Sequence, residues 1–247
     1  MARSLSTRGR FFAAYLVLGL AVGTGIGTFI VLLERDGPTP PPPWSSWVPS
    51  TETTAGRADQ IATHVGDAYR LPSGSRLTRV VVGAPGSGQG NLTAIAIPKI
   101  LQPRTVDDYT IYDPRKSLMY VLCGPGKGCK ITEGKPSVAR GTVLRREALE
   151  LALYSFEYSG VENVIVFFPP GKGEKGPTSA LFLRRGDLSR QLDQPLRQTL
   201  SNRPPLPGAI KPREEQTVND LTGARLFRYT LQDLQGGGRV LVLEPVV

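Results

Sequence analysis

Residues 11–33 form a stretch of 23 residues without a single charged side chain. A helix of this length rises about 35 Å, slightly more than the roughly 30 Å hydrocarbon core of a bilayer. Helices inside soluble domains rarely remain uncharged over such a distance. We therefore expect residues 11–33 to form one transmembrane helix, and the rest of the chain to be a domain attached to a membrane.

The charges on either side of this stretch indicate its orientation. Residues 1–10 carry three arginines and no acid, whereas the flank at Glu34, Arg35 and Asp36 is mixed. Lys and Arg near a spanning helix favour the cytoplasmic side, which predicts a cytoplasmic N-terminus and a C-terminal domain outside the cytoplasm. A cleaved signal peptide is the alternative. A cleaved signal peptide is disfavoured because the apolar run is long and is not followed by a cleavage site with small residues of the A-x-A kind. The pattern is therefore that of a signal-anchor.

Glycine recurs every fourth residue within this stretch, at Gly19, Gly23 and Gly27. Such a stripe lets a second helix approach closely, and it predicts a possible homodimer through this face. The alternative is that these glycines reflect only the general frequency of glycine in membrane helices.

Residues 34–53 are expected to be a linker. Prolines dominate residues 38–43, which should adopt an extended polyproline conformation and act as a stiff spacer. Trp44 and Trp47 follow. They could rest in the lipid interface, stack on a sugar ring or a peptide, or dock the linker onto the folded domain.

Composition predicts a folded remainder with a mildly basic surface. Hydrophobic residues make up 40% and charged residues 21% of the chain, and the formal net charge is +9. Arginine outnumbers lysine by 22 to 8, which suggests a bacterial genome of high GC content. An anionic envelope polymer or lipid headgroups are the partners that this charge favours. Nucleic acid is not expected outside the cytoplasm.

Periodicity predicts an α+β fold with a mixed β-sheet and packed helices. We expect a main domain at 54–202, a Pro-rich loop at 203–216 and a C-terminal β-hairpin within 217–247, packed on the main domain or forming a small subdomain. Helices are expected at 54–69 and 142–158, and strands at 76–82, 92–97, 117–122, 161–168, 179–184, 226–231 and 239–243. The order of strand 117–122, helix 142–158 and strand 161–168 predicts a β-α-β crossover with a parallel strand pair. The glycine-rich segment 83–90 lacks a Walker lysine and is expected to be the tip of a hairpin that joins two strands.

The only two cysteines, Cys123 and Cys129, bracket a short Gly/Pro loop. In an oxidising compartment this arrangement favours a disulfide. Redox catalysis is the alternative, but the spacing is not that of the C-x-x-C motif.

Candidate catalytic groups are limited to carboxylates. Asp107, Asp108 and Asp113 form one acidic group, for which turn chemistry is favoured over a metal site. Glu147 and Glu150 lie on the strongest predicted helix, where a solvated edge with an Arg146–Glu150 pair is favoured over acid–base chemistry. His64 is the single histidine, and it is a boundary helix position more readily than a catalytic base. We expect no metal and no cofactor.

These patterns favour a single-pass, membrane-anchored envelope protein that binds or organises a partner. Lys127, Lys130, Lys172 and Lys175 are the candidate contacts to an anionic partner. A carboxylate-only envelope hydrolase, such as a glycosidase, is the first alternative. A ligand sensor that acts through a membrane partner is the second.

Overall fold

A computed structural model gives the fold of the chain. It describes residues 7–34, 42–85, 92–100, 102, 105–171 and 178–246, and within 7–34 it describes side chains only at 11, 12 and 14–25. The chain divides into two compact units, Met1–Pro42 and Pro43–Val247.

The first unit contains helix α1, Thr7–Glu34. Its described side chains are exposed, and a Cβ added at Gly19 or Gly23 would meet nothing within 4 Å. Gly27, the third glycine of the expected stripe, lies outside the residues whose surroundings the structure describes. No helix over the described residues is both long enough and apolar enough to cross a bilayer, so the expected transmembrane span is not supported.

The second unit is an α+β domain built on one mixed sheet of eight strands. The strands are β1 (Arg79–Val82), β2 (Leu92–Pro98), β3 (Tyr109–Tyr112), β4 (Ser117–Cys123), β5 (Asn163–Phe167), β6 (Ser179–Arg184), β7 (Leu226–Asp233) and β8 (Arg239–Pro245). Their order across the sheet is β1-β4-β5-β6-β7-β8-β2-β3.

Strand directions confirm the mixed sheet and the parallel pair. β4 and β5 are parallel and are joined through α3, Val138–Ser159, which gives the expected β-α-β unit. β8 and β2 form a second parallel pair. The other five neighbouring pairs are antiparallel, including the C-terminal hairpin of β7 and β8, which belongs to the main sheet.

The prediction that residues 83–90 form the tip of a hairpin is wrong. β1 pairs with β4 at one edge of the sheet, whereas β2 pairs with β8 and β3 near the other edge. The segment that joins them therefore crosses between distant strands, and residues 86–91 of it lie outside the described residues. Strands that follow one another in sequence usually pair, but here β1 pairs with β4 and β2 pairs with β8.

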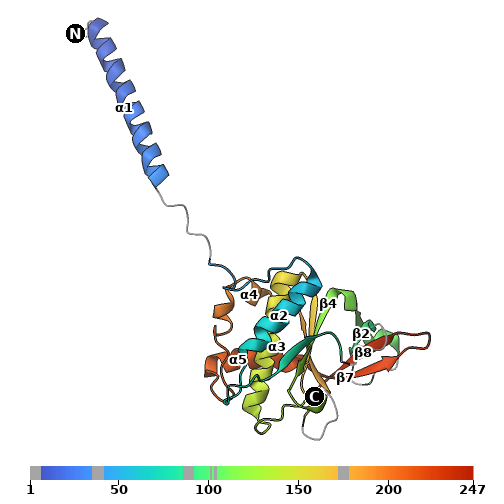
Figure 1. Cartoon of the computed structure of the whole chain (residues 1–247). Coiled ribbons are helices and arrows are strands. Elements are labelled where there is room, and N and C mark those ends of the chain that lie inside the picture. Colours follow the sequence, from blue (N-terminus) through green and yellow to red (C-terminus); the bar gives the residue numbers. More distant parts are fainter. Residues whose placement is uncertain are drawn as a thin grey trace. The chain divides into compact units, whose positions relative to one another are not determined.

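Helices cover one face of this sheet (Figure 1). They are α2 (Thr54–Ala68), α3, the short α4 (Ser189–Leu192) and α5 (Pro212–Thr222). α3 begins at the N-cap Ser137, whose side chain accepts from the Arg140 amide, and ends at Gly160 in the left-handed region. Fifteen of its 22 residues are buried, as expected for the main packing helix.

Alternate residues of the central strands face two separate cores. Val164 and Val166 of β5 face the helices, whereas Ile165 and Phe167 face the opposite side of the sheet. The sheet curls to enclose this second core. Tyr112 of β3 contacts Phe182 of β6 at 4.9 Å between ring centroids, although four strand spacings of about 4.8 Å would separate these strands in a flat sheet.

Cys123, the last residue of β4, forms a disulfide with Cys129. The loop between them is tightly wound, since the Gly124 amide donates to the Cys129 carbonyl at 2.9 Å. A Cβ at Gly124 would lie 2.4 Å from the Lys130 carbonyl carbon, so this position accepts only glycine without rearrangement. The predicted disulfide is confirmed.

Residues 43–53, here called the strap, lie on the helical layer. The Leu196 amide donates to the Trp44 carbonyl at 2.8 Å, and the Ser45 hydroxyl is bonded to the Tyr154 hydroxyl at 2.8 Å. The Trp44 ring meets the rings of Tyr154 and Tyr158 edge-on. The two tryptophans thus dock this part of the linker onto the domain, which was one of three expected roles.

Candidate functional site

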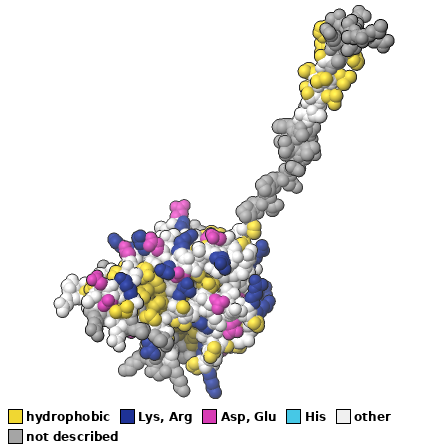
Figure 2. Space-filling view, turned by 180° about the vertical axis from the view of Figure 1, so that it is seen from behind, with side chains coloured by type: hydrophobic (Ala, Val, Ile, Leu, Met, Phe, Trp, Pro, Cys, Tyr) yellow, Lys and Arg dark blue, Asp and Glu magenta, His cyan; other side chains and the backbone are white. Residues whose placement is uncertain are grey.

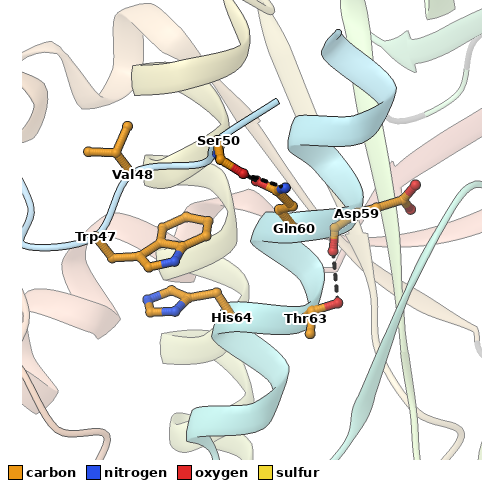
Figure 3. Close-up of a pocket in the computed structure, with 7 residues that line it drawn as sticks. All are labelled: Trp47, Val48, Ser50, Asp59, Gln60, Thr63 and His64. Carbon is orange, nitrogen blue, oxygen red and sulfur yellow. Dashed lines mark hydrogen bonds between the residues drawn. The ribbon is translucent and has the colours of Figure 1, made fainter. Parts of the chain in front are cut away.

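A hollow of about 580 Å³ opens where the strap runs past α2. The strap supplies one wall and α2 the other, as Figure 3 shows. We call it the strap hollow. Its lining residues are Trp47, Val48 and Ser50 from the strap and Asp59, Gln60, Thr63 and His64 from α2.

Two stacked rings form the aromatic wall of the strap hollow. The Trp47 indole lies parallel to the His64 imidazole, with 4.0 Å between centroids and 3° between planes. Tyr154 of α3 packs edge-on against both rings at 5.5 Å. The stack is thereby held from the domain side, and Trp47 remains half-buried at the hollow.

Hydrogen-bonding groups face the rest of the strap hollow. Gln60 accepts from the Ser50 amide at 2.7 Å and donates to the Ser50 hydroxyl at 3.0 Å. The Thr63 hydroxyl donates to the Asp59 carbonyl at 2.9 Å, and the Asp59 carboxylate points away from the ring stack (Figure 3). The hollow therefore combines a flat aromatic wall with amide and hydroxyl groups.

Burial lowers the pKa of His64. Glu150 and Asp67 act in the opposite direction through their charges, but desolvation is the largest effect. His64 is accordingly neutral near neutral pH, and it presents a planar aromatic face to Trp47 together with an imidazole that can donate and accept.

A buried ion-pair cluster lies deeper between α2, α3 and α5. Arg146 of α3 is fully buried and donates to Glu150 at 2.8 Å and to Glu214 at 2.7 Å. It also donates to the Tyr69 hydroxyl and, at 2.7 Å, to the Ser201 carbonyl. The expected Arg146–Glu150 pair is confirmed, but the expectation of a solvated edge is wrong, because α2, α5 and the segment around Ser201 cover this strip.

Hydrogen bonds offset the effect of burial on the carboxyl pKa for Glu214 but not for Glu147. Burial opposes ionisation of Glu214, but bonds from the Ser201 amide and from Arg146 lower its pKa. Glu147 is different. Burial raises its pKa to about 8, although Thr78 donates to one of its oxygens at 2.6 Å. Its second oxygen has no partner among the described residues.

The acidic group predicted near residue 107 does not gather around a site. Asp107 is exposed, Asp108 accepts from the Thr105 amide, and Asp113 pairs with Arg115. These bonds are local turn and cap contacts. Among the described residues, no group of three or more His, Cys, Asp or Glu side chains could hold a metal ion.

The predicted basic contacts are only partly within the described residues. Lys127 is exposed within the disulfide loop and Lys130 is exposed directly after it, whereas Lys172 and Lys175 lie outside the described residues. Figure 2 shows Lys and Arg side chains spread over one face of the domain, interspersed with acidic ones. Contact of these four lysines with an anionic partner stays a prediction.

Sequence reasoning missed α5 and its role in the buried cluster. Pro212 at the first helical position and the acids Glu214 and Glu215 in the first turn are helix-start signals that could have located it. The meeting of Gln60 with Ser50 and of Trp47 with His64 carries no sequence signal, because it depends on the path of the strap.

Comparison of the chain with models of protein families, with curated proteins and with solved structures finds no significant match.

Proposed function

We propose that this protein is a single-pass, membrane-anchored binding module of the cell envelope. Residues 11–33 serve as the anchor, the unit Pro43–Val247 lies outside the cytoplasm, and a ligand binds in the strap hollow. The uncharged sequence of residues 11–33 is the observation that supports the anchor, and the Cys123–Cys129 disulfide supports an oxidising compartment.

The strap hollow carries the proposal. It joins an aromatic wall to several hydrogen-bonding groups, and one wall residue, His64, has a lowered pKa. A concave, largely apolar site with a few polar groups and a shifted pKa is the usual form of a ligand site. The carboxylates considered for catalysis do not line it, and we assign the protein no catalytic step.

The ligand that we propose is a sugar unit of an envelope glycan. The C–H face of a sugar ring can pack on aromatic side chains, while its hydroxyl groups exchange hydrogen bonds with amides, hydroxyls and carboxylates. The strap hollow offers both kinds of surface, through Trp47 and His64 and through Gln60 and Thr63. The lysines 127, 130, 172 and 175 would add attraction to acidic groups of the same polymer.

Tryptophan fluorescence tests this proposal, because Trp44 and Trp47 are the only tryptophans. Trp44→Phe leaves Trp47 as the single emitter and retains an aromatic ring. Titration of this variant with N-acetylglucosamine oligomers is expected to quench and blue-shift the emission. Thr63→Val in the same background removes one hydroxyl from the hollow and should weaken the affinity roughly fivefold.

Thr217→Val is the matched control, since Thr217 also donates to the carbonyl four residues earlier in a helix but lies away from Trp47. It should leave the affinity unchanged. Emission that does not respond to the oligomers, or equal effects of the two Thr→Val changes, would contradict the sugar site. Lys127→Gln with Lys130→Gln should weaken binding of an acidic glycan and not of the neutral oligomers.

The orientation has its own expected result. In intact cells or spheroplasts, an added protease should degrade the unit Pro43–Val247 of the full chain without detergent. Protection of this unit until the membrane is dissolved would place it in the cytoplasm and overturn the orientation that we propose.

A further inference from the structure

A second hollow, of about 490 Å³, lies at the start of α5 and shares no lining residue with the strap hollow. Two segments contribute to it: residues 194–201, which include the turn Leu196–Gln198, and residues 211–217 at the start of α5. Its lining includes Arg197, Thr199 and Ser201 from the first segment and Lys211, Arg213 and Glu214 from the second.

Three cationic side chains line this hollow. Arg197, Lys211 and Arg213 are all exposed. Over the part of the chain that the structure describes, none of their side chains takes part in an ion pair. Their charges are therefore available to a ligand.

The single acid of the hollow does not cancel these charges. Glu214 accepts from the fully buried Arg146 at 2.7 Å, from the Ser201 amide at 2.9 Å and from the Ser201 hydroxyl at 3.1 Å. Its negative charge is thus offset in part inside the protein by Arg146, which Glu214 shares with Glu150. The three cations outnumber the one acid among the lining residues, so the hollow has a net positive charge.

Two further groups are suited to an anion. The Thr199 hydroxyl accepts from Gln194 at 3.2 Å, and its own proton can be donated to a ligand. α5 has 11 residues and begins without a side-chain cap, so its positive end adds to the field of the three cations.

We propose that this hollow binds a phosphate group. A phosphate ester carries about −1.5 to −2 charges at pH 7 and offers three acceptor oxygens, which matches three cations better than a single carboxylate does. Arginine binds phosphate oxygens through two parallel N–H groups, and lysine acts as a point charge. A small phosphorylated molecule and the headgroup of an anionic phospholipid share this chemistry.

Isothermal titration calorimetry on the full chain in a non-ionic detergent and a phosphate-free buffer tests the site. Glycerol 3-phosphate represents the small ligand, and dihexanoyl phosphatidylglycerol below its micelle concentration represents the lipid. Whichever probe binds identifies the source of the phosphate. Lys211→Gln with Arg213→Gln should weaken that binding roughly tenfold or more.

Arg79→Gln with Lys135→Gln is the matched control, because it also removes one exposed arginine and one exposed lysine but lies outside the hollow. It should change the affinity less than twofold. Heat release that is absent with both probes, or that falls equally in the two double variants, would overturn the phosphate site. This result is independent of the sugar titration, which reads Trp47 emission in the other hollow.

Discussion

Arg146→Met is expected to lower the free energy of unfolding by about 3 to 5 kcal/mol. The guanidinium is fully buried and joins α3 to Tyr69, Glu214 and Ser201. Its removal leaves Glu150 and Glu214 with side-chain exposures of 11% and 10% and no cation beside them. Chemical unfolding followed by far-UV circular dichroism measures the loss.

Arg145→Met provides the matched control, since Arg145 is the neighbouring residue and its recorded bonds are to the side chains of Asn219 and Thr142. Its loss should cost less than about 1 kcal/mol. The triple change Arg146→Met, Glu150→Gln and Glu214→Gln should recover much of the stability, because no buried charge is then left alone. Equal losses in the Arg145 and Arg146 variants would show that the cluster does not hold the helices together.

Glu147→Gln is expected to stabilise the protein at pH 8 and to flatten the dependence of stability on pH. Burial raises the pKa of Glu147 from 4.5 to about 8. Between pH 4.5 and pH 8, Glu147 is ionised in the unfolded chain and protonated in the folded protein. Stability is therefore full below pH 4.5 and falls as the pH rises toward 8, by up to roughly 4 kcal/mol.

The glutamine variant cannot ionise, so this loss disappears. Its amide group would occupy the position of the oxygen that lacks a partner, at a cost of about 1 to 3 kcal/mol. The net gain at pH 8 should be about 2 kcal/mol, with no gain at pH 4. Thermal unfolding between pH 4 and pH 8 measures it, with Glu244→Gln as an exposed control. Parallel pH profiles of the wild type and Glu147→Gln would show that Glu147 is ionised in the fold.

Local patterns in the sequence predicted most individual elements. The apolar run at β5 indicated a strand buried on both faces, and all five of its residues are buried. The order of strand, helix and strand predicted the parallel pair of β4 and β5. Both inferences succeed because burial periodicity and crossover topology are properties of contiguous segments.

Long-range relations could not be predicted in the same way. A helical wheel of α3 cannot show that Arg146 meets Glu214, which lies 68 residues away. For this reason the polar strip seemed solvated, and the buried cluster was missed. The two hollows were missed for a different reason. Each lies between a helix and an irregular segment close to it in sequence, and the path of an irregular segment has no periodicity from which it can be predicted.

The pairing of β2 with β8 has a consequence for how the chain folds. Thr93 donates to the Arg239 carbonyl across this pair, over 146 residues of sequence. β2 and β3 therefore have no partner on the β8 side until residues 239–245 have also been synthesised. Pairings this distant slow folding and leave strand edges unprotected meanwhile. We expect the helical side, with β4, α3 and β5, to be organised first and the curled end of the sheet to close last.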